Sequence, residues 1–270
     1  MSATTSPGPS DGGRRPLAVV TGASSGIGLA LAHGLAERGH DLVVCAEDDD
    51  VAGLRADPAP ATAVSAVRAD LATSDGVDRL VAAVEAAGAP VDVLALNAGV
   101  GLGGPFLEAD LADHEHLVEL DVLAVVRLAH RLLPAMVARG AGRVLVTSSV
   151  AATMPGPWYA TYAASKTFVQ SFTEALRHEL RGSGVTLTAL QPGPTDTAFF
   201  ERADMTSTLA ARGPKSDPAD VARAGLEALF AGDDHVVVGA LGKSQAAMAR
   251  VLPVPAQAAV HGAATRPRGG

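Results

Sequence analysis

The stretch Thr21-Gly22-Ala23-Ser24-Ser25-Gly26-Ile27-Gly28 joins an apolar run, Leu17–Val20, to an amphipathic segment, Ile27–Arg38. Glycines between a strand and a helix let the backbone approach a phosphate, and the helix N-terminus offers unpaired N–H groups. The spacing Gly-x3-Gly-x-Gly differs from the commoner Gly-x-Gly-x2-Gly. Any one glycine could belong to a plain turn, but three in this context predict a pyrophosphate-binding loop.

Short apolar runs alternate with longer amphipathic segments along the rest of the chain. Most runs are apolar on both faces, which is typical of a parallel sheet covered by helices on each side. The alternation predicts an α/β fold, a doubly wound parallel sheet of the Rossmann type in a single domain. The predicted strands are Leu17–Val20, Asp41–Cys45, Val64–Arg68, Val91–Leu96, Arg143–Thr147, Val185–Leu190 and His235–Val238. The predicted helices are Ile27–Arg38, Asp50–Arg55, Ser74–Ala87, His114–Arg139, Tyr159–Arg181 and Pro218–Phe230.

Composition divides the chain into three predicted parts. Residues 1–15, rich in Ser, Thr, Gly and Pro, are expected to be a flexible tail, and residues 16–242 a nucleotide-binding domain. Residues 243–270 are a C-terminal extension, partly disordered, because Gly262–Gly270 is small and basic. Within it, Val251–Val260 could form a membrane-surface patch, a subunit arm or a lid.

The bulk properties exclude several classes of function. A net charge of −8 argues against nucleic-acid binding, which usually needs a basic face. The only cysteine, Cys45, permits no internal disulfide, suits a reducing compartment and is expected to be a buried, inert thiol. No signal-like segment opens the chain, and no apolar run reaches the roughly 18–20 residues of a membrane span. We expect a cytoplasmic protein with no metal site.

The turn after the second predicted strand, Glu47-Asp48-Asp49-Asp50, bears on cofactor choice. Carboxylates there would repel a 2′-phosphate, whereas Glu47, nineteen residues past Gly28, could accept hydrogen bonds from a free ribose diol. Solvation of the loop, or capping of the short helix after it, explains Asp48 to Asp50 about equally well. Since neither the glycine loop nor this turn contains Lys or Arg, NAD is favoured over NADP.

Tyr162 and Lys166 lie four residues apart in a predicted helix and therefore share one face. A nearby ammonium favours the ionised phenol, which makes the pair a candidate general acid/base. Two exposed helix residues would show the same spacing, so the pair indicates a catalytic site only together with other motifs. Ser149 precedes Tyr162 by thirteen residues, and Ser148 is its competitor.

Taken together, these motifs resemble the short-chain dehydrogenases/reductases, over residues 16–240. The family's markers occur in order. They are Thr21-Gly22-x3-Gly26-Ile27-Gly28, Asp70-Leu71, Asn97-Ala98-Gly99, Ser149, Tyr162-x3-Lys166, and Pro192-Gly193 with Thr197.

The resemblance implies a role for each marker. Tyr162 would exchange a proton with the substrate oxygen, Lys166 would bind the nicotinamide ribose and lower the pKa of Tyr162, and Ser149 would position the reacting oxygen. Asp70 would lie near the adenine ring, although it could instead cap the helix that begins near Ser74. For Asn97 the resemblance implies mainly a role in stabilising the central sheet. The implied cofactor-binding residues are Gly22, Ser24, Ser25, Gly26, Ile27, Gly28, Glu47, Asp70, Leu71, Asn97, Ala98, Gly99, Tyr162, Lys166, Pro192, Gly193 and Thr197.

One catalytic position departs from the family pattern. Asp121 stands where the family has an asparagine, whose backbone carbonyl holds a water that completes a proton relay from the lysine. A backbone role could survive the change, but a buried carboxylate would alter the local field and could pair with Lys166. We therefore expect an active enzyme with a shifted pH profile.

On the substrate side the resemblance implicates Ala151–Trp158, which carries Met154, and Thr195–Pro214. The second segment holds Phe199, Phe200 and Met205, in a chain with only 3% aromatic residues. They suggest an apolar alcohol or carbonyl substrate, although ordinary packing is as good an explanation. Arg202 is expected to be a surface residue, and Tyr159 to line the pocket or pack beside it.

The leading hypothesis is an NAD(P)-dependent oxidoreductase that interconverts a secondary alcohol and a ketone or aldehyde, as a homodimer or homotetramer. The alternative is a nucleotide-binding regulatory or scaffold protein that has lost turnover. Asp121 alone favours this alternative, whereas intact Ser149, Tyr162 and Lys166 oppose it. Dehydration or epimerisation on the same scaffold stays open, because one fold hosts many reactions.

Overall fold

A seven-stranded parallel sheet organises the computed structural model, which describes residues 14–55, 62–249 and 251–267. The strand order is β3-β2-β1-β4-β5-β6-β7. The strands are β1 (Leu17–Thr21), β2 (Asp41–Ala46), β3 (Val64–Arg68), β4 (Val91–Leu96), β5 (Gly142–Thr147), β6 (Val185–Pro192) and β7 (His235–Val238). All seven predicted strands are present, and the single-domain, doubly wound fold is confirmed.

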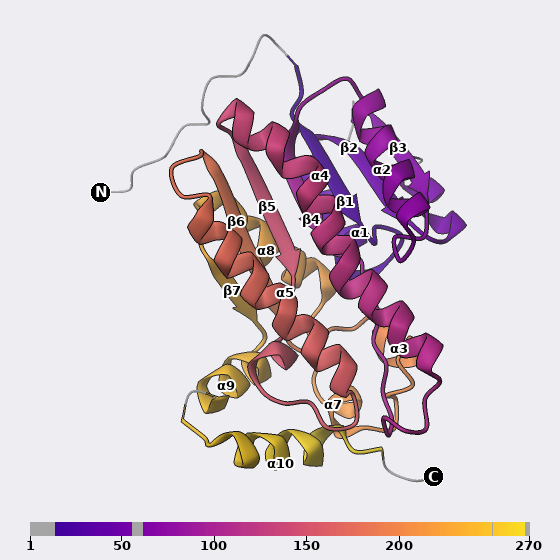
Figure 1. The fold of residues 1–270 in the computed structure, drawn as a ribbon, viewed down its shortest axis with the longest axis vertical. Coiled ribbons are helices and arrows are strands. Elements are labelled where there is room, and N and C mark those ends of the chain that lie inside the picture. Colours follow the sequence, from indigo (N-terminus) through magenta and orange to yellow (C-terminus); the bar gives the residue numbers. More distant parts are fainter. Residues whose placement is uncertain (1–13, 56–61, 250, 268–270) are drawn as a thin grey trace.

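Helices cover both faces of the sheet (Figure 1). Alternate side chains of β1 enter different cores: Leu17 and Val19 pack on one face, Ala18 and Val20 on the other. This double burial explains why the strands are apolar throughout. The first face is covered by α2 (Ser74–Ala86), α4 (Ala124–Arg139) and α5 (Ala160–Glu179), and the second by α1 (Gly26–Glu37) and α8 (Pro218–Ala231).

The segment predicted as one helix, His114–Arg139, contains an irregular turn. The α-helix α3 (Leu111–Val118) passes into a π-helical turn, η2 (Glu119–Leu123), before α4 begins. A π turn adds a residue to the helix and is frequent at functional sites. Asp121 lies in this turn with no exposed surface.

Two further helices follow β7 and lie beside the carboxyl ends of the strands (Figure 1). They are α9 (Ala240–Ala249) and α10 (Val254–Thr265), so the predicted boundary at residue 242 falls inside a helix. The prediction that the chain is disordered from Gly262 is wrong for residues 262–265. They are ordered because Thr265 Oγ1 donates to the Pro157 carbonyl at 2.8 Å, a contact made far along the chain.

The remaining elements are short. They are η1 (Asp49–Arg55), η3 (Val150–Thr153), α6 (Phe199–Arg202) and α7 (Leu209–Arg212). Of the predicted flexible tail, residues 1–13 lie outside the described residues, whereas Arg14 and Arg15 form ion pairs with Asp92 and Asp41. Within the described ranges, every helix is too short or too polar to cross a bilayer.

The ends of β1 and β4 are joined by one buried hydroxyl. Thr21 Oγ1 accepts hydrogen bonds from the backbone N–H groups of Asn97, at 2.9 Å, and Ala98, at 3.0 Å. It can also donate to the Ala95 carbonyl, at 3.4 Å. After β1 the chain enters α1 on one face, and after β4 it continues to α4 on the other. Such a switch point opens a crevice at the carboxyl ends of the strands, and Thr21 fixes its base.

We predict that Thr21→Val lowers the free energy of unfolding by about 2–3 kcal/mol, because two buried N–H groups lose their acceptor. Thr21→Ser keeps the hydroxyl and should cost only about 1 kcal/mol, the value of a lost methyl group. Urea denaturation of both variants measures the difference. Equal losses in the two variants would contradict the proposed role of the hydroxyl.

Candidate active site

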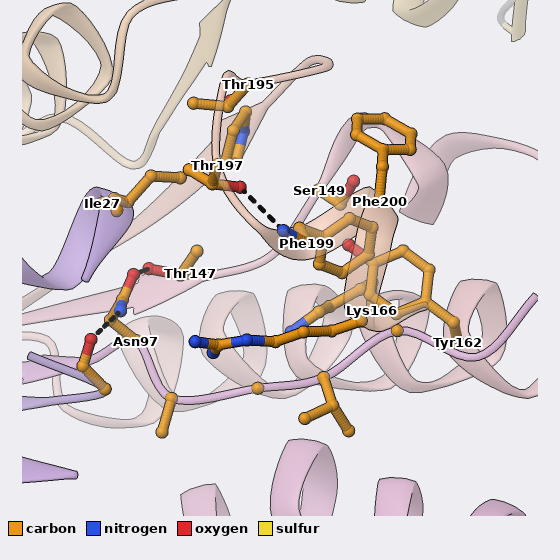
Figure 2. A pocket seen from close by; sticks show the side chains of 18 of the residues that line it. Ile27, Asn97, Thr147, Ser149, Tyr162, Lys166, Thr195, Thr197, Phe199 and Phe200 are labelled. Carbon is orange, nitrogen blue, oxygen red and sulfur yellow. Dashed lines mark hydrogen bonds between the residues drawn. The ribbon is translucent and has the colours of Figure 1, made fainter. Parts of the chain in front are cut away.

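A cavity of about 300 Å³ opens at the carboxyl ends of the strands. Figure 2 shows part of its wall, with Ile27 and Thr197 on one side and Tyr162, Lys166 and Ser149 on the other. The sequence-predicted residues that line it are Gly22, Ser24, Ser25, Gly26, Ile27, Glu47, Asp70, Leu71, Asn97, Ala98, Gly99, Ser149, Tyr162, Lys166, Pro192, Gly193 and Thr197. Two predicted site residues, Gly28 and Asp121, lie behind the wall instead.

The glycine loop has the geometry that an anion requires. Gly22 and Gly26 have φ angles of +67° and +56°, in the left-handed region that favours glycine. A Cβ on Gly28 would lie 2.0 Å from the Gly22 carbonyl oxygen, so Gly28 lets α1 pack closely under the loop. Ser25, the N-cap of α1, makes no side-chain capping bond, and the first turn holds no acidic residue. The N-terminus of α1 therefore fits the pyrophosphate of a dinucleotide.

The four acidic residues after β2 differ in position: two line the cavity and two begin the short helix η1. Glu47 and Asp48 both line the cavity, Glu47 exposed and Asp48 half-buried. Ser24 Oγ donates to Asp48 Oδ2 at 2.9 Å, whereas Asp48 Oδ1 is buried with no hydrogen-bond partner among the described residues. Asp49 and Asp50 lie in the first turn of η1, as the capping alternative expects. Asp48 is thus joined to the glycine loop, a contact that sequence spacing did not single out.

An arginine approaches this turn from a neighbouring strand. Arg68, at the end of β3, donates from Nη1 to Asp49 at 2.9 Å and from Nε to the Glu47 carbonyl at 3.1 Å. The sequence analysis found no cation in the loop or the turn, and Arg68 belongs to neither. In the structure its guanidinium is already paired with a carboxylate.

Asp70 does not cap α2. The N-cap is Thr73, whose Oγ1 accepts from the Gly76 N–H at 3.0 Å. Asp70 instead accepts from the Ala72 N–H at 2.9 Å, and it lines the cavity. The capping alternative is therefore wrong, because Thr73 already occupies that position.

Asn97 joins three strand ends. Its Nδ2 donates to the Thr21 carbonyl at 3.2 Å. Its Oδ1 accepts from Thr147 Oγ1 at 3.0 Å (Figure 2). These contacts bridge β1, β4 and β5, in agreement with a sheet-stabilising role. Since Asn97 also lines the cavity, it fixes the part of the wall that faces a ligand.

The two adjacent serines after β5 differ in their contacts. Ser148 Oγ donates to the Lys166 carbonyl at 3.0 Å and is therefore committed to the backbone of α5. Ser149 Oγ accepts from the Ala151 N–H at 3.1 Å, and its hydroxyl is placed to lower the pKa of Tyr162. The geometry favours Ser149 over Ser148 as the residue that contacts a reacting oxygen.

A buried ion pair lies behind Tyr162. Lys166 Nζ is 3.1 Å from Asp121 Oδ2, and the side chains are 6% and 0% exposed, respectively. Asp121 also accepts from the Val100 N–H at 2.8 Å and from Ser165 Oγ at 3.1 Å. A Cβ on Gly99 would lie 2.9 Å from both Asp121 Oδ1 and Lys166 Nζ, so only glycine leaves room for the pair. The expected pairing of Asp121 with Lys166 is present.

The ion pair governs the charges around the phenol. Burial raises the pKa of Tyr162, whereas Lys166 and the hydrogen bond from Ser149 lower it and Asp121 raises it; the pKa is raised overall. Burial lowers the pKa of Lys166, but Asp121 and Tyr162 outweigh burial, so this pKa is raised too. The lowering of the Tyr162 pKa expected from Lys166 is therefore present as a contribution, but burial exceeds it.

The substrate side of the cavity is mainly apolar. Phe199, Phe200 and Met205 all line it, and the rings of Phe199 and Tyr162 lie 5.1 Å apart (Figure 2). Arg202 is exposed, as expected, although it borders the cavity. Of the segment Ala151–Trp158, only Ala151 belongs to the cavity wall.

Several lining residues were not anticipated from the sequence. Gln245, His261, Ala264 and Thr265 come from α9 and α10, and they close the cavity beside Tyr159. The only signal in the sequence was His261, a histidine among small residues directly after Val251–Val260. Residues 251–260, all of which the structure describes, contribute nothing to the cavity wall, so the three alternatives for Val251–Val260 stay open.

The comparisons with known proteins agree with this geometry. A family model described as short chain dehydrogenase matches residues 16–207. The uncharacterized oxidoreductase YbbO of Escherichia coli (strain K12) is 35% identical over 201 residues, which are 70% of this chain and 70% of that protein.

Two solved structures are similar over almost the whole chain. A short-chain dehydrogenase/reductase from Burkholderia phymatum in complex with NAD has 29% identity and a TM-score of 0.77, covering 87% of this chain and 92% of that one. A short-chain dehydrogenase from Sphingobium yanoikuyae in complex with NADPH also has 29% identity, with a TM-score of 0.73, covering 88% and 96%.

We predict that Asp121→Asn moves the whole pH–rate profile to lower pH. Asp121 raises the pKa of Tyr162 and that of Lys166, so removing its charge lowers both. With the acid/base role that the resemblance implies for Tyr162, alcohol oxidation requires the ionised phenol, so the rate should begin to rise at lower pH and the high-pH limb should move the same way. Initial rates from pH 5 to pH 11 or so measure both limbs.

Glu119→Gln is the matched control. Glu119 lies in the same π turn but pairs with Arg127 at the surface, at 2.9 Å. Its neutralisation should leave the profile in place. An unchanged profile in Asp121→Asn would contradict the electrostatic role of the buried carboxylate.

Proposed function

The chain belongs to the short-chain dehydrogenase family, and we propose that it transfers a hydride between a nicotinamide cofactor and the carbon of a secondary alcohol or of a ketone or aldehyde. One observation carries this proposal. Ser149, Tyr162 and Lys166 share a single cavity with the glycine loop. A protein that only bound nucleotide would not need this set.

In the proposed reaction the protein moves one proton and positions one oxygen. Ser149 and Tyr162 hold the substrate oxygen by hydrogen bonds, and Tyr162 Oη donates a proton during reduction or accepts one during oxidation. Bound nicotinamide supplies or accepts the hydride. Lys166 Nζ, 5.6 Å from the centre of the Tyr162 ring, stabilises the phenolate and would contact the cofactor ribose.

Asp121 acts through Lys166 in this proposal. The Asp121 carboxylate holds Lys166 Nζ on the face of α5 that also carries Tyr162. Its negative charge offsets the free-energy cost of burying the Lys166 ammonium. It does not line the cavity, so it is a positioning residue rather than a contact for substrate. Asp121 therefore weakens the scaffold alternative, since the aspartate occupies an ordered place beside the lysine.

NAD is the proposed cofactor. Glu47 and Asp48 face the cavity where an adenine ribose would lie, and a 2′-phosphate there would meet negative charge. The exposed carboxylate of Glu47 is the acceptor that we propose for a ribose hydroxyl. The relatives with bound cofactor include both types, so the argument for NAD depends on these two carboxylates.

The proposed substrate is small and largely apolar, because Phe199, Phe200 and Met205 flank Tyr162. We also propose a homodimer or homotetramer. Phe168 on α5 is 44% exposed and stacks on Phe172, an apolar pair that a second subunit would cover. A cytoplasmic location, expected from Cys45, stays a prediction.

We predict that the protein oxidises NADH in the presence of apolar ketones or aldehydes, followed as loss of absorbance at about 340 nm. Tyr162→Phe should abolish turnover, by roughly a thousandfold or more, because the proton donor is lost. Retention of NADH binding by Tyr162→Phe shows that the variant is folded. Cofactor binding without turnover across a broad panel of carbonyl compounds would support the scaffold function instead.

We further predict that kcat/KM is higher with NADH than with NADPH. Asp48→Asn and Glu47→Gln should each reduce this preference, on the order of tenfold, by removing a charge close to the 2′ position. Asp50→Asn is the control, since Asp50 is exposed and does not line the cavity. A wild-type preference for NADPH would refute the assignment.

A further inference from the structure

A histidine from the C-terminal helix forms part of the cavity wall beside the proposed acid/base. His261 on α10 is 6% exposed, and its ring meets the ring of Tyr159 edge-on, with centroids 5.2 Å apart and an interplanar angle of 86°. The Tyr159 ring in turn lies 5.9 Å from that of Tyr162. The reaction proposed above uses neither His261 nor Tyr159.

Each ring nitrogen of His261 has a polar group within hydrogen-bonding distance. Nδ1 lies 2.9 Å from the Pro155 carbonyl oxygen. Nε2 faces the Tyr159 hydroxyl at hydrogen-bonding distance, and it lies 3.0 Å from Gln245 Nε2. All of these contacts lie within the described residues.

These partners determine the tautomer. A carbonyl oxygen only accepts, so the Nδ1 beside Pro155 must carry a proton. Burial lowers the pKa of His261, which favours the neutral ring. A neutral ring protonated at Nδ1 has one lone pair on Nε2, and the group nearest to this nitrogen is the Tyr159 hydroxyl. Gln245 Nε2 has a separate acceptor in the Val150 carbonyl, at 3.4 Å. His261 Nε2 is therefore an acceptor, and the Tyr159 hydroxyl directs its proton toward His261.

The hydroxyl oxygen of Tyr159 consequently has lone pairs but no proton to offer to the cavity. The Tyr159 ring itself packs with Ala151, Phe200 and Met205 in one apolar cluster. Burial raises the pKa of Tyr159, so the group is a phenol and not a phenolate.

We propose that His261 fixes the Tyr159 hydroxyl as a hydrogen-bond acceptor, which selects substrates carrying a hydroxyl or N–H donor within a few bonds of the reacting carbonyl. This inference rests on the proposed function and narrows its substrate class to hydroxy- or amino-substituted carbonyl compounds. A substrate without the donor leaves a buried acceptor unpaired, and such a loss discriminates strongly between otherwise similar ligands.

A purely structural role for His261 makes a different prediction. If His261 only held α10 in place, other anchors of that helix would matter equally. Thr265 Oγ1 donates to the Pro157 carbonyl at 2.8 Å, and Arg266 lies 5.6 Å from the ring centre of Trp158. Thr265→Val is therefore the matched control, because it weakens the attachment of α10 and, at His261, removes only a contact with the backbone carbonyl, at 2.9 Å, while the rings of Tyr159 and His261 keep their partners.

The test compares kcat/KM for two ketones of nearly equal size, 4-hydroxy-2-butanone and 2-pentanone. The wild type should prefer the hydroxy ketone by about tenfold, the value of one hydrogen bond. Tyr159→Phe and His261→Phe should each reduce the preference to near unity while 2-pentanone is still reduced. Thr265→Val should retain the preference.

A second measurement does not depend on activity. Nitrogen-15 NMR of the His261 ring should show a proton on Nδ1 and a bare Nε2 at neutral pH. A proton on Nε2 would overturn the inference, because Tyr159 would then offer its own proton to the cavity and select an acceptor.

The kinetic outcomes distinguish failure of the substrate inference from failure of the proposed oxidoreductase function. Reduction of both ketones without discrimination by the wild type, or a preference that survives Tyr159→Phe, refutes the substrate inference alone. Failure of the wild type to reduce any carbonyl compound refutes the proposed function, and this inference falls with it.

Discussion

The site depends on keeping an ammonium charged inside an apolar interior. Lys166 is almost fully buried, and an uncompensated charge there would cost several kcal/mol. Asp121 provides the compensation, and the structure around it serves the pair. The π turn places the carboxylate, the Val100 N–H and the Ser165 hydroxyl hold its oxygens, and Gly99 leaves the space. Several local irregularities thus have one electrostatic cause.

The same region is where the two halves of the sheet diverge. Thr21 and Asn97 tie the ends of β1, β4 and β5 together by hydrogen bonds to backbone and side-chain groups. Gly99 and Val100 lie two and three residues after Asn97, so the framework that fixes the crevice also fixes the loop against which the ion pair packs. Rigidity at the base of the cavity and charge placement beside the phenol are therefore parts of one arrangement.

Features encoded over short distances could be predicted from the sequence. The glycine loop, the seven strands and the shared face of Tyr162 and Lys166 all follow from local spacing, and the structure has them as expected. The predictions were less complete where contacts are long-range. The bond between Ser24 and Asp48 depends on the path of the turn after β2. The contact between Tyr159 and His261 spans 102 residues, and no periodicity indicates it.

The C-terminal helix has an evolutionary consequence. The family match ends at residue 207, whereas α9 and α10 begin at Ala240 and complete the cavity wall. The groups proposed to carry out chemistry and one part of the cavity wall thus belong to separate stretches of the chain. Substitutions in the last two helices can therefore change this part of the wall while the sheet and its buried ion pair stay as they are.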